Sequence, residues 1–200
     1  MSSEFDTKTK ILAATWTLME AARGTGVALQ DIAKAAGVSR QAIYLHFANR
    51  TELLLATTRY VDNVLDSDAR LAASRASTNG RERLAAYIDA WGRYIPEIYG
   101  IGKAIMASLD TDDAAATAWA DRMAAMRHGC EAAINALAAD GELAPEWTQA
   151  RAVDVLWTML LIPNWEQLTE RCGWTTEMYI EHMQLAAARL FVADHAPPHD

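Results

Sequence analysis

Apolar residues recur every three or four positions along almost the whole sequence, and alanine is abundant throughout. This spacing gathers apolar side chains on one face of an α-helix, whereas strands would need strict alternation, which no stretch shows. Glycine and proline interrupt the pattern often enough to predict about nine separate helices. The sequence therefore predicts an all-α fold, and its 200 residues are ample to bury a core without disulfides or metal.

Cysteine content and hydropathy narrow the class of protein. Cys130 and Cys172 are the only cysteines, too few for a disulfide framework or a four-cysteine zinc site. We expect both to be small buried packing residues in preference to oxidant sensors. The N-terminus lacks the apolar stretch of a secretory signal, and no apolar run approaches the roughly 18 residues that span a bilayer. These features predict a cytoplasmic protein without membrane contact.

Charge is distributed unevenly along the chain, whose formal net charge is −8. Residues 1–60 carry seven Lys or Arg against five Asp or Glu, which leaves a net charge of −10 for residues 61–200. A locally basic segment in an acidic chain is typical of contact with a polyanion. Random scatter of surface charge is the alternative, so this signal needs a motif to support it.

Residues 29–47 read LQDIAKAAGVSRQAIYLHF, which predicts two short helices joined by a tight turn. Gly37 can adopt the left-handed conformation that ends the first helix, and Ser39 can cap the second. Asn49 can cap a third helix together with Glu52, and the apolar stripe of that helix continues to about Ser74. This is the pattern of a helix-turn-helix motif. Its inward face would consist of Ile32, Ala36, Ile43 and Phe47.

The outward face of the second helix carries side chains suited to a major groove. Arg40 and Gln41 can make bidentate contacts with guanine and adenine, and Leu45 can meet a thymine methyl group. Tyr44, His46 and Arg50 are placed to contact phosphates. A tight corner between two helices of an ordinary helical protein is the alternative. The combination of turn, polar face and local positive charge favours DNA binding.

Residues 10–65 resemble the N-terminal domain of TetR-type transcriptional regulators. The resemblance rests on Asp31-Ile32-Ala33, Ala36-Gly37-Val38-Ser39, Ile43-Tyr44-Leu45-His46-Phe47, Asn49-Arg50 and Leu53-Leu54. It implies a dimeric repressor with its recognition helix at residues 40–46 and a larger C-terminal domain for an inducer and for dimerisation. By position, bases would be contacted by Arg40, Gln41, Ala42 and Leu45, and phosphates by Tyr44, His46 and Arg50, with Ser39 completing the candidate DNA-binding set.

Two positions depart from the family pattern. Ala28 stands where many members have Thr, so a helix cap and a phosphate contact are expected to be absent. Arg50 replaces the commoner Lys, which keeps the charge but alters the geometry of any contact.

We expect a three-helix DNA-binding domain at residues 1–50, a connecting helix at 51–74, and a ligand-binding and dimerisation domain at 75–200. Residues 153–162 (VDVLWTMLLI) are apolar almost all round, which favours burial against a second subunit as well as the chain's own core. A helix pair inside a monomer is the alternative. The predicted helices of this part are 81–99 with Pro96 near its end, 103–109, 112–140, 145–172 interrupted at Pro163, and 175–194.

Six of the seven tryptophans follow residue 80, and aromatic and methionine side chains accompany them. Each one alone is more often plain core, but together they favour a cavity for an apolar or aromatic ligand. The candidate pocket residues are Trp91, Tyr94, Tyr99, Met106, Trp119, Met123, Trp157, Met159 and Trp165.

Motifs for catalysis, metal or cofactor binding are absent, so we expect no enzyme and no cofactor. The sequence predicts a homodimeric regulator that binds a palindromic operator in double-stranded DNA and is released from it by an unidentified small-molecule inducer. A DNA-binding dimer without an inducer is the first alternative, and an all-α enzyme is a remote second.

Overall fold

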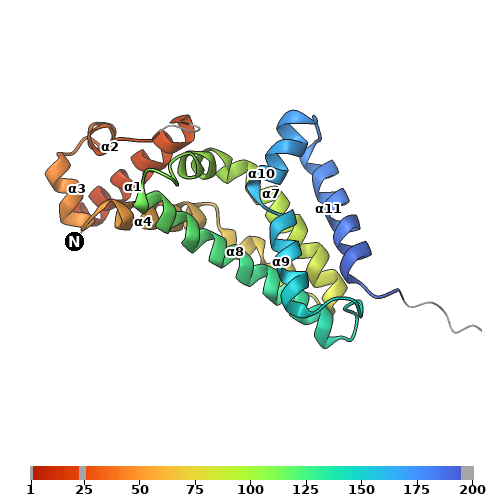
Figure 1. The fold of residues 1–200 in the computed structure, drawn as a ribbon. Coiled ribbons are helices and arrows are strands. Elements are labelled where there is room, and N and C mark those ends of the chain that lie inside the picture. The colour runs from red at the N-terminus through yellow and green to blue at the C-terminus, as the bar shows by residue number, and fades with distance from the viewer. Residues whose placement is uncertain (1, 23–25, 195–200) are drawn as a thin grey trace, which may run out of the picture. The chain divides into compact units, whose positions relative to one another are not determined.

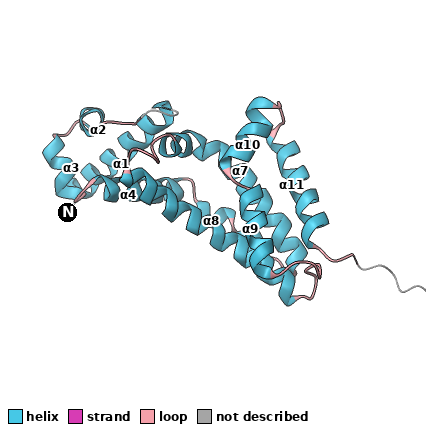
Figure 2. Ribbon diagram, in the orientation of Figure 1, coloured by secondary structure: helices cyan, strands magenta, loops and turns pink. Residues whose placement is uncertain are grey.

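The structure is a computed structural model, and it describes residues 2–22 and 26–194. Over this part of the chain it contains eleven α-helices and one π-helical turn and no strand beyond an isolated bridge between Leu143 and Val192 (Figures 1 and 2). The predicted all-α class is confirmed. The helices are α1 (Ser2–Ala22), α2 (Leu29–Ala36), α3 (Arg40–His46), α4 (Arg50–Val64), α5 (Ser67–Arg70), α6 (Ala72–Ala76), α7 (Gly80–Met106), α8 (Asp113–Ala139), α9 (Gln149–Met159), α10 (Ile162–Glu166) and α11 (Thr176–Phe191), and the π-helical turn is Gln167–Arg171.

The chain divides into two compact units, each built from two stretches of sequence. The first unit comprises Met1–Ser67 and Glu97–Ala124, and the second comprises Asp68–Pro96 and Ala125–Asp200. The long helices α7 and α8 therefore contribute residues to both. The functional division expected at residues 50 and 74 stays a prediction.

The first unit contains two apolar clusters. One joins α1, α2, α3 and the beginning of α4, and each of its residues is less than a tenth exposed. The second joins α1 and α4 to the end of α7 and the beginning of α8. The helix-turn-helix segment is thus seated on a core of its own. The first cluster consists of Ile11, Leu12, Ile32, Ala33, Ile43, Phe47 and Leu53.

The second unit packs its own core from α7, α8, α9, α10 and α11. Trp147, ahead of α9, meets Phe191 of α11 edge to face, with ring centroids 5.2 Å apart. On α9, Val153 and Leu156 are buried while Asp154 and Thr158 face outward. The inner face of residues 153–162 is therefore apolar and buried, and most of their other apolar side chains are partly buried within the single chain.

Several helix boundaries differ from those predicted. The helix expected to continue to Ser74 ends at Val64, because Asp66 adopts a left-handed backbone with φ of 50° and turns the chain into α5. Pro96 lies inside α7, on an exposed position, so the two helices expected on either side of residue 100 are one. Pro145 precedes the helix it was expected to begin, since α9 begins after the Thr148 cap. The break at Pro163 is confirmed.

Candidate nucleic-acid interface

The turn between α2 and α3 is made by the residues that the sequence indicates. Gly37 lies in the left-handed region, with φ of 67° and ψ of 32°, where a Cβ would be strained. The N–H of Gly37 donates to the carbonyl oxygen of Lys34, and that of Val38 donates to the carbonyl oxygen of Ala33. These bonds satisfy carbonyl groups that the helix end would otherwise leave without donors. The predicted turn is confirmed.

Ser39 begins α3 as its N-cap, because its Oγ accepts a hydrogen bond of 3.1 Å from the N–H of Ala42. Ile43 and Phe47 are buried, so α3 is held to the domain by one apolar face. The Asn49 cap of the next helix is also confirmed, whereas the Glu52 side chain bonds one residue before the cap. Asn49 accepts from the N–H of Glu52, and the Glu52 carboxylate accepts from the N–H of Ala48.

The opposite face of α3 is open. Arg40, Gln41, Tyr44 and Leu45 are exposed, and Leu45 retains 81% of its accessible surface. The Arg40 guanidinium lies 5.9 Å from the centroid of the Tyr44 ring. This face, with an exposed leucine next to a phenol and a guanidinium, is suited to bind a partner that offers both apolar and anionic groups.

The remaining candidates on α3 lie at the edges of this face. Ala42 and His46 are half-buried, and the His46 ring packs beside that of Phe47, with centroids 6.4 Å apart. Phe47 also lies 5.5 Å from the ammonium of Lys8, an exposed α1 residue that the sequence analysis overlooked. Nothing in the local sequence links Lys8 to α3; only the packing of α1 against Phe47 does so.

Arg50 does not share the open face. Its Nε donates a 2.6 Å hydrogen bond to Oδ2 of Asp112, and its Nη1 donates to the carbonyl oxygen of Val27 at 2.9 Å. Its side chain is 27% exposed. The predicted phosphate contact of Arg50 stays a prediction, and the structure shows this guanidinium bound within the protein.

Asp112 is the other residue that sequence reasoning missed. Burial acts to raise its pKa, but the hydrogen bond and charge of Arg50, with the N–H groups of Ala114 and Ala115, outweigh burial and hold the pKa below its usual value. Its place before a helix is a sequence signal for a cap. Its pairing with a residue 62 positions away is not.

The segment that contains the candidate interface also matches a known family. Residues 5–57 match the family described as bacterial regulatory proteins, tetR family. Residues 5–57 are therefore similar to the DNA-binding region of TetR-family proteins. Ala28, the departure from the TetR pattern, indeed begins α2 without a side-chain cap.

A curated relative matches about a third of the chain. The HTH-type transcriptional activator FasR of Mycolicibacterium smegmatis is 38% identical over 68 residues. The aligned segment covers 34% of this chain and only 30% of that protein.

Solved structures of TetR-type proteins match the fold of this chain over nearly its whole length. A TetR-family transcriptional regulator from Rhodococcus sp. has a TM-score of 0.71 and 23% identity, with 95% of this chain and 99% of that chain covered. A transcriptional regulator from Saccharomonospora viridis in complex with choline has a TM-score of 0.73 and 17% identity, with 93% and 97% covered. At these identities the likeness is one of fold.

The nine candidate pocket residues are divided between the units. Tyr99, Met106, Trp119 and Met123 belong to the first unit, and the other five belong to the second. In the second unit, the Trp91 N–H donates to the carbonyl oxygen of Leu160 at 2.7 Å. The joint role of the nine candidate residues in a pocket stays a prediction. The second-unit group is Trp91, Tyr94, Trp157, Met159 and Trp165.

Two buried polar atoms in the second unit have no hydrogen-bond partner in the described structure. They are Nε1 of Trp157 and the hydroxyl oxygen of Tyr179. Buried polar atoms are costly to leave without a partner, so each is suited to meet a polar atom of a ligand or an ordered water.

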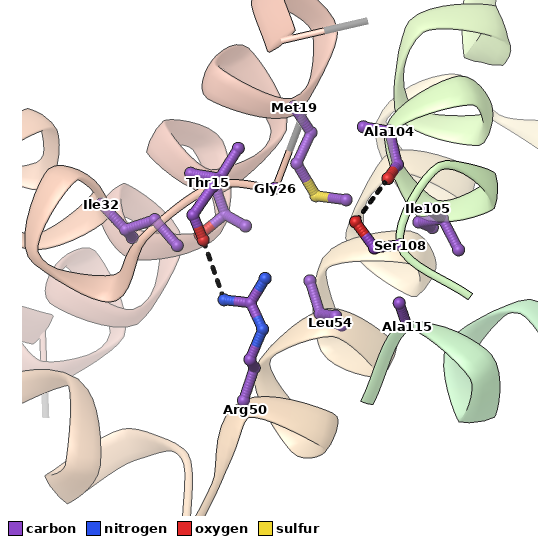
Figure 3. A pocket seen from close by; sticks show the side chains of 11 residues that line it. Thr15, Met19, Gly26, Ile32, Arg50, Leu54, Ala104, Ile105, Ser108 and Ala115 are labelled. Carbon is purple, nitrogen blue, oxygen red and sulfur yellow. Dashed lines mark hydrogen bonds between the residues drawn. The ribbon is translucent and has the colours of Figure 1, made fainter. Parts of the chain in front are cut away.

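A small cavity in the first unit has a different lining. Its volume is about 10 Å³, room for roughly one water molecule. Thr15, Met19, Leu54 and Ser108 line it, and the Arg50 side chain extends into it from the start of α4 (Figure 3). None of the nine candidate pocket residues borders this cavity.

The two cysteines differ. Cys130 is buried, and its thiol lies 3.8 Å from the hydroxyl of Tyr87, which itself donates to the carbonyl oxygen of Met126. Burial raises the pKa of Cys130 to about 12, so its thiol stays protonated and unreactive at neutral pH. Cys172 is exposed, so the expectation that it is a buried packing residue is wrong.

The described residues contain neither a metal-binding cluster nor a membrane-spanning helix. No group of three or more His, Cys, Asp or Glu side chains is arranged to hold a metal ion. No helix in the described part of the chain is long and apolar enough to cross a bilayer.

Proposed function

We propose that the protein is a cytoplasmic, non-enzymatic transcriptional regulator that recognises a palindromic operator with α3. The observation that carries this proposal is the open face of α3, on which Arg40, Gln41, Tyr44 and Leu45 are exposed while Ile43 holds the helix in place. Arg and Gln can contact purine edges, and Leu45 can contact a thymine methyl group. Ser39, Ala42 and His46 complete the contact surface.

The proposed regulator acts as a homodimer, since one short helix reads too little DNA for a specific site. Three apolar side chains of α11 support this assembly, because each is 39% or more exposed in the single chain: Met178, Leu185 and Leu190. Helix pairs of this kind form two-fold interfaces between identical subunits. Two recognition helices would then read half-sites spaced roughly 34–36 Å or a multiple of that apart.

The regulator is further proposed to be a repressor that releases DNA when a small apolar or aromatic inducer binds. The aromatic residues of the second unit and the partnerless Trp157 N–H support a ligand with one or two polar atoms. The Saccharomonospora viridis protein was crystallised with choline, a cation. Here Asp89 pairs with Arg93 and Asp154 with Arg127, which favours an uncharged ligand. An activator, as the Mycolicibacterium smegmatis relative is named, or a regulator without an inducer is the alternative.

Selection from a pool of random duplexes tests DNA recognition. The wild-type protein should enrich a palindrome, and Gln41→Ala should relax the preference at one base position in each half-site by roughly 1–3 kcal/mol. Gln149→Ala, which alters an exposed glutamine of α9, is the matched control and should select the parent sequence. Failure of the wild-type protein to enrich any sequence would refute the proposal.

Thermal shift and tryptophan fluorescence against aromatic, aliphatic and cationic metabolites test the inducer. An inducer should raise the melting temperature and lower the affinity for the selected duplex. A compound that binds without changing DNA affinity, or a panel with no binder, favours the regulator without an inducer. Binding of choline but not of aromatic compounds would contradict the uncharged ligand class.

A further inference from the structure

We propose that Arg50 and Asp112 form a clamp that positions the helix-turn-helix for DNA, in place of a direct contact between Arg50 and phosphate. This inference rests on the proposed DNA-binding function. Arg50 begins α4, and Asp112 immediately precedes α8. Both belong to the first unit, and both side chains are at least two-thirds buried.

The guanidinium of Arg50 connects three separate parts of the first unit. Nε donates to Oδ2 of Asp112, Nη1 donates to the carbonyl oxygen of Val27, and the Arg50 backbone belongs to α4. Val27 is two residues before α2, and Arg50 follows α3 by four residues. One hydrogen bond therefore joins the two ends of the α2–α3 motif. The ion pair with Asp112 then attaches that junction to the start of α8.

Asp112 is itself held in a fixed orientation. Its second oxygen, Oδ1, accepts hydrogen bonds from the N–H groups of Ala114 at 3.0 Å and Ala115 at 3.4 Å. Both carboxylate oxygens are thus engaged, one with the first turn of α8 and the other with Arg50. A carboxylate at a helix start with an arginine on its free oxygen has little freedom to rotate. The position of Arg50 is therefore set by α8.

A phosphate contact through Nε or Nη1 of Arg50 would require this arrangement to be broken. The guanidinium would then leave one oxygen of the mostly buried Asp112 carboxylate unpaired, at a cost in free energy. Other cations need no such change. Among the described residues of the first unit, Lys8, Lys34 and Arg40 have no carboxylate within 4 Å, and all three are exposed. These side chains supply the positive charge that meets phosphates.

The neutral variant Asp112→Asn separates the two roles because they predict opposite effects. Asparagine remains a good helix cap, so α8 keeps its start while the ion pair is lost. If Arg50 is part of a clamp, affinity for the duplex selected by the wild-type protein should fall between about 2- and 30-fold with an unchanged salt slope. If Arg50 contacts phosphate, removing its competitor should tighten binding. Asp113→Asn, the same change at the exposed neighbour, is the control and should stay near wild type.

A second variant keeps the inference testable if Asp112→Asn folds poorly. Arg50→Lys retains a cation that can meet phosphate but cannot bind Asp112 and Val27 together. The clamp predicts weakened binding for this variant, and little further loss when it is combined with Asp112→Asn. Wild-type affinity for Arg50→Lys, or a salt slope lowered by about 1 in Arg50→Ala, would overturn the clamp. A wild-type protein that selects no duplex overturns the DNA-binding proposal itself, a distinct result.

Discussion

The arginines of the first unit whose side chains the structure describes fall into two groups. On α3, Arg40 is exposed and stacks beside Tyr44, with no carboxylate within 4 Å among the described residues. Along α4 and α8, each arginine is paired: Arg50 with Asp112, Arg59 with Asp121, and Arg122 with Asp62 and Asp121. The same side chain therefore serves two purposes. Cations left unpaired on a surface are available to a partner, and paired ones hold helices together.

The paired group also reveals how α4 and α8 pack. Residues 50 and 59 of α4 meet residues 112 and 121, so the pairs advance by the same nine positions along both segments. The two helices therefore run in the same direction over this stretch. Buried apolar residues between them, such as Leu54, Val61, Ala115 and Ala118, complete the contact. Charge at the edges and apolar burial at the centre fix the register.

Among these predictions, Arg40→Ala, which removes the unpaired arginine, should have the largest effect, and that effect should be on DNA affinity. Loss of a base or phosphate contact is expected to weaken binding of the selected duplex by about 1–3 kcal/mol. The free energy of unfolding should change by less than about 0.5 kcal/mol, since no pair is lost. Fluorescence anisotropy and urea unfolding measure the two quantities. A large loss of stability with intact DNA binding would reverse the assignment.

Arg122→Met, which removes a paired arginine, should lower stability and leave DNA binding unchanged. Its side chain is 23% exposed, and its removal leaves Asp62 and Asp121 without this cation. The free energy of unfolding is expected to fall by about 1–2 kcal/mol, between the values for exposed and buried pairs. The salt slope of DNA binding should stay that of the wild type. A reduced slope would show that Arg122 also meets phosphates.

Lowering the pH should reduce the stability that the paired arginines contribute, without a comparable effect at Arg40. The Arg122 hydrogen bond holds the pKa of Asp121 below its usual value, and the pKa of Asp112 is likewise lowered. A depressed pKa stabilises the folded state above the ordinary value near 3.9, and this contribution is lost as pH falls through the folded-state pKa. The stability difference between wild type and Asp112→Asn should therefore be constant from pH 5 to 7 and shrink below about pH 4. A difference that persists at pH 2 would contradict this linkage.

Arg59→Ala should have the smallest effect. Its ion pair with Asp121 is 3.4 Å long, and the arginine side chain is 63% exposed. Such pairs contribute about 0–1 kcal/mol, so unfolding should shift by at most about 0.5 kcal/mol. Asp121 keeps its partner Arg122 in this variant. A shift as large as that of Arg122→Met would mean that the exposed pair matters as much as the half-buried one.

The features predicted correctly are those encoded within a few residues. Gly37 ends α2, Ser39 and Asn49 cap the following helices, and Ile43 and Phe47 face inward, because each depends on its immediate neighbours. The exposure of Tyr44 and Leu45 followed from helical geometry alone. The local chemistry of this motif was therefore sufficient to place the candidate interface.

The features that were missed depend on residues distant in sequence or on tertiary context. The partner of Arg50 lies 62 positions away, so no local pattern could show that its guanidinium is engaged. The helix with Pro96 near its end was expected to stop at Tyr99, yet α7 continues to Met106, and Ile95 and Ile101 are buried on either side of the proline. Asp66 takes a backbone conformation that favours glycine, and a sequence offers no warning of it.

Gly100 of α7 constrains which positions of this protein can be mutated. The carboxylate of Glu20 accepts the N–H of Ile101 and lies against Gly100 so closely that a Cβ there would overlap the Glu20 carboxylate and crowd its Cα. Mutant libraries should leave position 100 unchanged, because even alanine would displace the Glu20 carboxylate and crowd the backbone of α1. Substitutions are better placed at the exposed positions of α3, which carry the proposed operator contacts and lie outside the buried core.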